Sequence, residues 1–175
     1  AGVGMTYVLC GRGLDLSIGS QVGMSGVVLG ALMVWWNVPI VLAIFIALLV
    51  GALAGAINGF FVVVLRVPPF IATLATFYGY RGILEGVTKG TPISPMPESF
   101  KIIGLGSLFG VAYVIWFMIF LFIVATFVLR KTKYGRYTLA MGGNPQSTRL
   151  AGISTKKLTF SLYVLMGVLA CIAGI

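Results

Sequence analysis

Long uncharged stretches dominate the chain, and their lengths are the first clue to its fold. No charged residue occurs from Leu16 to Leu65, a run of fifty positions. About 20 apolar residues cross the hydrocarbon core of a bilayer as a helix, so this run is too long for one crossing. It must reverse once, and Asn37-Val38-Pro39 is the expected reversal, because proline stops a helix and asparagine suits a turn.

The same pattern predicts about five membrane spans after the tail of an earlier one. The predicted fold class is therefore all-α, a polytopic transmembrane helix bundle, and residues 90–110 are expected to form a loop. Both ends of the chain lie inside apolar sequence, so we expect an internal piece of a longer membrane protein, truncated at both ends. The tail is Ala1–Leu9, and the spans are Leu16–Trp36, Ile40–Leu65, Phe70–Thr88, Val111–Leu129 and one that begins near Leu158.

The basic residues orient these spans. Only 9% of the residues are charged and 59% are hydrophobic, yet the net charge is +9. If the spans alternate, two basic residues (Lys89 and Lys101) fall on one side, nine fall on the other, and Arg81 lies within a span. Cytoplasmic loops are enriched in Lys and Arg, so the side with nine is predicted to be cytoplasmic, and the charge indicates orientation rather than a nucleic-acid partner. The nine are Arg12, Arg66, Arg130, Lys131, Lys133, Arg136, Arg149, Lys156 and Lys157.

The scarcity of reactive side chains narrows the chemistry. The chain has no His and three carboxylates, Asp15, Glu85 and Glu98, so a Ser-His-Asp triad is impossible. No phosphate-cradling motif is present, and we expect this chain to bind no nucleotide, metal or other cofactor of its own. Cys10 and Cys171 have neither CxxC spacing nor a His partner, and we interpret them as small buried apolar residues.

Glycines recur at helical spacing in the first two complete spans. Such stripes of small residues let helix backbones approach closely, so they favour tight packing in a bundle, with flexibility for gating as the alternative. The stripes are Gly19, Gly23, Gly26 and Gly30 in one span and Gly51, Gly55 and Gly59 in the next.

Five residues within the spans are candidates for a translocation path. Arg81 and Glu85 are four residues apart, so they are expected to pair on one helix face, either as a structural ion pair or as a wall of the path. Nearby, Phe77 and Tyr80 suit stacking on a sugar ring, or alternatively face the lipid or the core. Asn58 suits an interhelical hydrogen bond or a polar point on the path.

Two further polar features lie at the cytoplasmic border. Asp15 is expected to cap the helix that follows it. Pro145–Ala151 is predicted to form a two-turn helix capped by Asn144 and ended by Gly152, with Gly142-Gly143 freeing the chain before it. So short a helix is unstable alone in water, which suits docking into a groove of another protein; the alternative is a solvated loop that gathers positive charges.

Four stretches, in order along the chain, carry a resemblance to a known family. They are Gly11–Ser20, Val67–Leu74 with Arg81-Gly82, Thr88–Ile93, and Gly135–Tyr137 with Ala140–Pro145 and Arg149–Ile153. These stretches resemble the ribose/xylose-type permeases of ABC sugar importers, and the resemblance covers essentially all 175 residues. Pro145-Gln146-Ser147-Thr148 departs from the acidic and small residues that this family often has there.

The resemblance implies a non-enzymatic permease subunit of an ATP-driven importer of a monosaccharide or similar small polar solute. Residues 1–175 would be a partial permease domain in the bacterial inner membrane, with residues 130–157 as its cytoplasmic coupling loop. Its partners would be membrane lipid, a second permease subunit, a periplasmic sugar-binding protein, and cytoplasmic ATPase subunits that hold ATP and Mg. The implied ATPase-coupling residues are Gly142, Gly143, Asn144, Pro145, Gln146, Arg149, Leu150 and Gly152.

Two other classes of protein compete with this interpretation. A secondary transporter or channel for a small polar solute is the alternative, although Glu85 is the one carboxylate within a span that proton coupling would use. An intramembrane enzyme is disfavoured, because His is absent and acidic residues are scarce.

Overall fold

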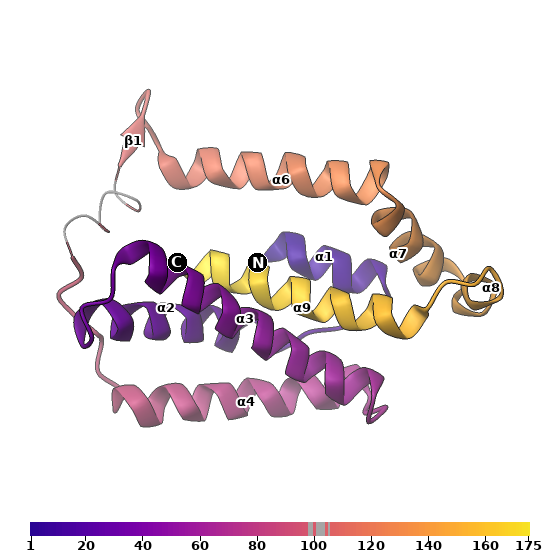
Figure 1. The fold of residues 1–175 in the computed structure, drawn as a ribbon, viewed down its shortest axis with the longest axis horizontal. Coiled ribbons are helices and arrows are strands. Elements are labelled where there is room, and N and C mark those ends of the chain that lie inside the picture. The colour runs from indigo at the N-terminus through magenta and orange to yellow at the C-terminus, as the bar shows by residue number, and fades with distance from the viewer. Residues whose placement is uncertain (98–99, 101–103, 105) are drawn as a thin grey trace.

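The computed structural model describes residues 1–97, 100, 104 and 106–175, and within these it contains eight helices and one short hairpin (Figure 1). Lys101, one of the two basic residues expected on the outer side, lies outside the described residues. The helices are α1 (Gly2–Cys10), α2 (Ile18–Val34), α3 (Ile40–Val63), α4 (Pro69–Thr88), α6 (Tyr113–Lys131), α7 (Lys133–Gly143), α8 (Pro145–Leu150) and α9 (Thr155–Gly174).

A helix lies at the position of every predicted span, and the helical membrane bundle is confirmed. Within the described chain, α3, α6 and α9 are long and apolar enough to cross a bilayer, and α2 is apolar but shorter. Helix α4 has 20 residues, yet it is not among the three, and it is the helix that carries Arg81 and Glu85.

At each predicted reversal one residue has a left-handed backbone conformation. Asn37 has a φ of 51°, in the left-handed region that asparagine tolerates better than most residues, and Pro39 immediately precedes α3. The next helix, α3, ends at Val63; Arg66, with a φ of 58°, lies in the turn that follows, and Pro69 is the first residue of α4. Each reversal sends the chain back alongside the helix before it (Figure 1).

The predicted loop over residues 90–110 is partly wrong, because its end forms a hairpin. Ser107–Leu108 (β1) pairs antiparallel with Val111–Ala112 (β2), around a turn in which Phe109 and Gly110 have φ values of 54° and 77°. Two positive φ values suit the right-handed twist of a tight hairpin. The predicted span from Val111 accordingly begins two residues later, as α6.

Helix α9 packs most closely against α3. A Cβ added at Gly55 would overlap the carbonyl group of Tyr163, and one at Gly167 would overlap the carbonyl oxygen of Gly51. A Cβ at Gly51 would lie 2.6 Å from that of Cys171. The stripe Gly51–Gly59 therefore serves close packing as predicted, whereas a Cβ at Gly19 would meet only ordinary contact, at 3.8 Å.

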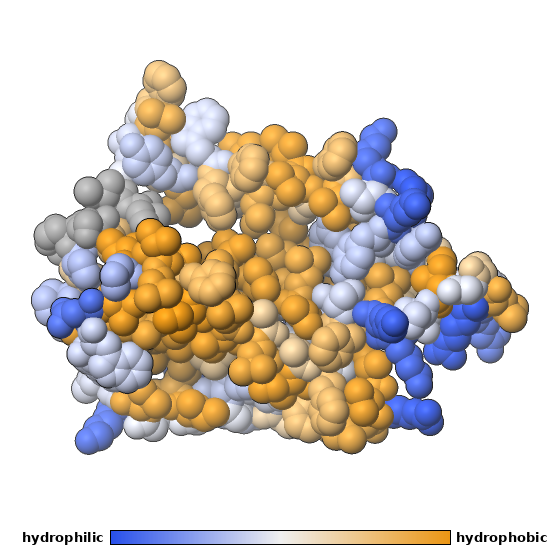
Figure 2. Space-filling view, in the orientation of Figure 1, coloured by the Kyte–Doolittle hydropathy of each residue, from blue (hydrophilic) through white to orange (hydrophobic). Residues whose placement is uncertain are grey.

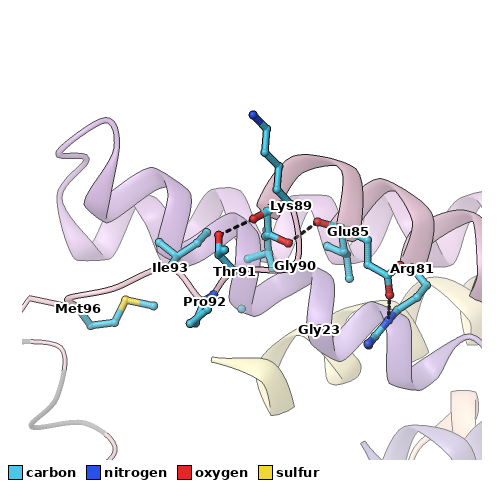
Figure 3. Close-up of a pocket in the computed structure, with 13 residues that line it drawn as sticks. Gly23, Arg81, Glu85, Lys89, Gly90, Thr91, Pro92, Ile93 and Met96 are labelled. Carbon is cyan, nitrogen blue, oxygen red and sulfur yellow. Dashed lines mark hydrogen bonds and ion pairs between the residues drawn. The ribbon is translucent and has the colours of Figure 1, made fainter.

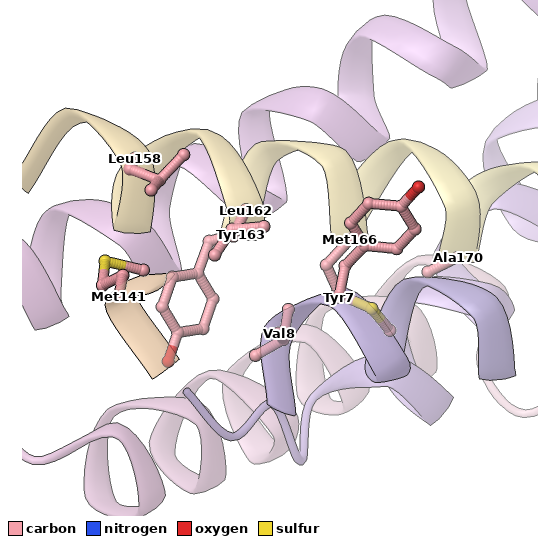
Figure 4. Packing of buried hydrophobic residues seen from close by; sticks show 8 residues of the cluster. All are labelled: Tyr7, Val8, Met141, Leu158, Leu162, Tyr163, Met166 and Ala170. Carbon is pink, nitrogen blue, oxygen red and sulfur yellow. The ribbon is translucent and has the colours of Figure 1, made fainter. Parts of the chain in front are cut away.

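The buried core gathers around α9 (Figure 4). Side chains from α1 and α7 pack onto one side of this helix, and Tyr163 and Met166 are fully buried. On the opposite side, Leu29, Ala43, Ala47 and Cys171 join α2 and α3 to it. The eight residues of the first cluster are Tyr7, Val8, Met141, Leu158, Leu162, Tyr163, Met166 and Ala170.

The two ends of the bundle differ in polarity. All nine basic residues assigned to one side lie at the end where α6 meets α7 and α3 meets α4, which we call the basic end. Hydrophilic residues gather there over α7 and α8, while hydrophobic residues cover the middle of the visible face (Figure 2). This separation agrees with a bundle that crosses a bilayer with the basic end in the cytoplasm.

The separation of charge predicts the topology. Tags inserted between Gly90 and Pro97 should be accessible from outside the membrane, and tags between Lys131 and Lys157 only from the cytoplasm. The reason is that loops rich in Lys and Arg stay on the cytoplasmic side (the positive-inside rule). Accessibility of tags in intact cells measures this. Finding both segments on one side would contradict the span assignment.

The α3–α9 contact predicts a packing-sensitive glycine. In the full-length protein, Gly55→Ala should lower stability by about 1–3 kcal/mol, because the added methyl group forces two backbones apart. Thermal unfolding in a mild detergent measures the change. Gly86→Ala is the matched control, since a Cβ there has nothing within 4 Å; equal shifts for both variants would refute the importance of the contact.

Candidate functional site

Helix α8 is a short, capped projection at the basic end. The Asn144 side chain accepts hydrogen bonds from the backbone N–H groups of Gln146 (3.0 Å) and Ser147 (3.1 Å), so the predicted cap is present. The helix ends at Leu150, one residue before the predicted end, and Gly152 follows with a φ of 81°. Leu150 is 90% exposed.

The two glycines before α8 have a different role from the one predicted. Gly142 and Gly143 do not free the chain, because they are the last residues of the helix α7. A Cβ at Gly142 would overlap the carbonyl oxygen of Cys10, so this glycine permits a close approach of α7 to the end of α1. The Arg12 side chain then donates to the carbonyl oxygens of Gly142 (2.8 Å) and Gly143 (3.3 Å).

The other side of α8 is also attached to the bundle. Thr148 is buried, and the Arg149 Nε atom donates to Thr155 Oγ1 at 2.9 Å, at the start of α9. An open cavity of about 550 Å³ lies next to Gly152 and is lined in part by Tyr134 and Lys157. Burial raises the pKa of Tyr134, and its hydrogen bond with Ser161 lowers it in part, so this phenol stays neutral at neutral pH.

A second open cavity, of about 860 Å³, lies at the opposite end between α2, α4 and the segment that follows α4 (Figure 3). Arg81 and Glu85 line it and form the predicted ion pair, with Arg81 Nε 2.9 Å from Glu85 Oε1. Both side chains are about 60% exposed within this chain (60% and 61%), so the pair faces the cavity and is not buried in the bundle.

The other three residues predicted for the path lie apart from this cavity. Tyr80 is buried, and its hydroxyl donates to the carbonyl oxygen of Ala54 at 2.9 Å. Phe77 is half-buried and packs edge-on against Tyr78. Asn58 is fully buried between helices, which confirms the predicted interhelical hydrogen bond.

Asn58 belongs to a buried polar cluster at the basic end, and Asp15 is its centre. Asp15 does not cap α2 as predicted, because it accepts from the N–H (2.9 Å) and hydroxyl (2.6 Å) of Ser17, the residue before that helix. The side-chain amides of Gln21 and Asn58 approach the same carboxylate at 3.3 Å. Asn58 in turn accepts from Thr76 Oγ1 at 2.6 Å, so the cluster joins α2, α3 and α4.

Neither this cluster nor the Arg12 contact was predicted from the sequence. Ser17 and Gln21 are four residues apart and share a helix face, which was a usable signal for the cluster. Nothing in the sequence indicated that Arg12 would reach across to α7. Within the described residues, no three His, Cys, Asp or Glu side chains gather in a way that suits a metal ion.

The comparisons with known proteins all point to transport permeases. Residues 1–175 match the model of a family described as the permease component of branched-chain amino acid transport systems. The ribose import permease protein of Haemophilus influenzae is 40% identical, over 99% of this chain and 54% of that protein. The xylose transport system permease protein of the same species is 29% identical, over 99% of this chain and 62% of that protein.

A third relative takes a different solute. The autoinducer 2 import system permease protein of Escherichia coli O9:H4 is 37% identical, over 99% of this chain and 50% of that protein. The chain thus spans about half the length of the curated relatives it matches. No solved structure matches it significantly. Together with the apolar helices, these relatives show a multi-pass membrane protein.

The buried cluster predicts a strong effect of losing Asn58. Asn58→Leu should lower the stability of the full-length protein by about 1.5–3 kcal/mol, because it leaves the buried Asp15 carboxylate short of donors. Thermal unfolding measures it, with Asn37→Gly as the control, since Asn37 lies exposed in a left-handed turn that glycine adopts readily. A stability loss no larger than in the control would show that the cluster is unimportant.

Proposed function

Because the chain belongs to the family of permease components of branched-chain amino acid transport systems, we propose that it forms part of the transmembrane subunit of an ATP-driven importer. The proposed solute is a monosaccharide or a similar small polar molecule, since the relatives are named for ribose, xylose and autoinducer 2. Residues 1–175 form part of its permease domain, and residues 130–157 are the coupling loop.

The observation that carries this proposal is the geometry of α8. A six-residue helix is too short to be stable alone, yet this one is capped by Asn144 and attached to the bundle on both sides. It presents Leu150 to solvent at the basic end, where an apolar side chain gains free energy once a partner covers it. We assign that partner as a cytoplasmic ATPase subunit, which holds the ATP and Mg that this chain has no motif to bind.

The contact residues follow from this arrangement. Leu150 is the apolar anchor, and Gln146 and Arg149 contribute polar contacts around it. Asn144 and Pro145 set the start of the helix, Gly142 and Gly143 end α7 just before it, and Gly152 follows its end. The proposed coupling residues are Gly142, Gly143, Asn144, Pro145, Gln146, Arg149, Leu150 and Gly152.

The opposite end of the bundle is proposed to receive the solute. The cavity beside Arg81 and Glu85 combines charged groups with apolar walls, a composition that suits a polar ligand. Arg81 and Glu85 line this part of the path, whereas Phe77 and Tyr80 lie earlier on α4 and Asn58 lies buried on α3, apart from the cavity. A periplasmic sugar-binding protein delivers the solute there, a second permease subunit completes the path, and lipid of the bacterial inner membrane surrounds both.

The test of this function is the loss of ATPase binding. Leu150→Asp in the full-length permease should reduce ATPase recovery in a pull-down by at least about tenfold, since a buried anchor residue contributes on the order of 2 kcal/mol or more. Solute-stimulated ATP hydrolysis should fall with it, while the amount of permease in the membrane stays unchanged.

Leu108→Asp is the matched control, because this half-exposed leucine lies in the hairpin at the opposite end. It should recover the ATPase as the wild type does. Equal recovery and equal stimulated hydrolysis by Leu150→Asp would refute α8 as the coupling element. No ATPase recovery by the wild type itself would instead favour a secondary transporter or channel.

A further inference from the structure

The connection between α1 and α2, residues Gly11–Ser17, contacts more of the molecule than its length suggests. At its start, Arg12 donates to the carbonyl oxygens of Gly142 and Gly143, the last two residues of α7 before α8 begins. In its middle, the carbonyl oxygen of Leu14 accepts from the Tyr163 hydroxyl of α9 at 3.1 Å. Near its end lies Asp15, whose carboxylate accepts hydrogen bonds from side chains of α2 and α3.

The backbone of Arg12 is in a conformation that arginine disfavours. Its φ is 62°, in the left-handed region, where any residue with a Cβ is crowded and glycine is not. The turn itself would therefore form more easily with glycine at this position. Arg12 nevertheless occupies this position, and its side chain binds the two carbonyl oxygens at the end of α7.

The other end of the connection is held by hydrogen bonds to the neighbouring helices. The Asp15 carboxylate is 1% exposed and receives hydrogen bonds from three side chains, those of Ser17, Gln21 and Asn58. A buried carboxylate keeps its donors, because removing them leaves a charge in a medium that does not solvate it. The connection is thus fixed to α2 and α3 directly and, through Asn58 and Thr76, to α4.

We infer that Arg12 is a positioning residue that links α8 mechanically to the membrane helices. When α8 is displaced, the guanidinium group holds the α7–α8 junction against the Gly11–Ser17 connection. The displacement then reaches α2, α3 and α4 through the Asp15 cluster, since coupling between distant sites is carried by continuous packed and hydrogen-bonded contacts. This inference rests on the proposed coupling of α8 to an ATPase and adds the route by which the bundle responds.

Arg66 provides a matched control for Arg12. Both are arginines at the basic end, and both have a left-handed backbone, with φ values of 58° and 62°. The Arg66 side chain makes none of the hydrogen bonds found among the described residues and lies at the α3–α4 turn, away from α7. Replacing either arginine by glycine relieves the same backbone crowding, so the difference between the two variants reports the Arg12 side chain.

The first measurement uses the full-length permease alone. Hydrogen exchange of the peptide that covers residues 140–150 should be faster in Arg12→Gly than in the wild type and in Arg66→Gly, because the α7–α8 junction loses its two side-chain donors. Unchanged exchange in Arg12→Gly would overturn the inference without any reference to an ATPase.

The second measurement uses the permease assembled with its ATPase and the solute-loaded binding protein. Arg12→Gly should still recover the ATPase, since Leu150 is untouched, but the solute-stimulated part of ATP hydrolysis should fall about fivefold or more, the lower range of usual coupling between sites. Arg12→Lys keeps one donor group, so its stimulated hydrolysis should lie between those of the wild type and Arg12→Gly. Arg66→Gly should match the wild type.

The outcomes separate this inference from the function it rests on. Stimulated hydrolysis as strong in Arg12→Gly as in the wild type would overturn the inference while leaving the docking of α8 intact. A similar loss in Arg66→Gly would also overturn it, because the effect would then belong to the basic end in general. Loss of ATPase recovery in the wild type would contradict the proposed function, and the exchange measurement would then decide the role of Arg12 alone.

Discussion

The close approach of α3 and α9 is the constraint on which the rest of the structure depends. Glycines stand where the two backbones meet, and side chains at Gly55 or Gly167 would overlap the facing carbonyl groups. Lipid chains are as apolar as leucine, so membrane helices associate through such packing and through interhelical hydrogen bonds more than through exclusion of water. With α9 fixed against α3, its remaining faces bury side chains from α1, α2 and α7, and its first turn supports α8 through Thr155.

Polar contacts between elements gather at the basic end. The Asp15 cluster joins three helices there, and Arg12 joins the same connection to α7. The opposite end is more open, with a cavity beside an exposed ion pair. A bundle of this kind suits a subunit that a partner moves at one end and that receives solute at the other. Membership of the permease family leads us to propose these two roles for the two ends.

The amino-acid sequence predicted the helices well and the polar contacts poorly. Charge-free runs, prolines and the basic asymmetry located each span to within a few residues, because bilayer thickness limits helix length so strongly. Asn144 and Gly152 likewise located α8, since capping is a local interaction. Arg12 was missed because its partners in α7 lie 130 and 131 positions away, and the cluster at Asp15 was missed because Asn58 lies 43 positions away. The exposure of the Arg81–Glu85 pair also depends on neighbouring helices, which the spacing of the two residues does not reveal.

The contact between α8 and an ATPase subunit in the assembled membrane complex can be tested by crosslinking. A photo-crosslinking residue at position 150 of the full-length permease, irradiated in native membranes, gives a covalent record of what that position contacts. We expect an adduct with the ATPase from position 150 and none from position 108 in the hairpin at the opposite end. Adducts from position 150 with lipid or with the permease alone, and none with the ATPase, would contradict the docking of α8 on the ATPase.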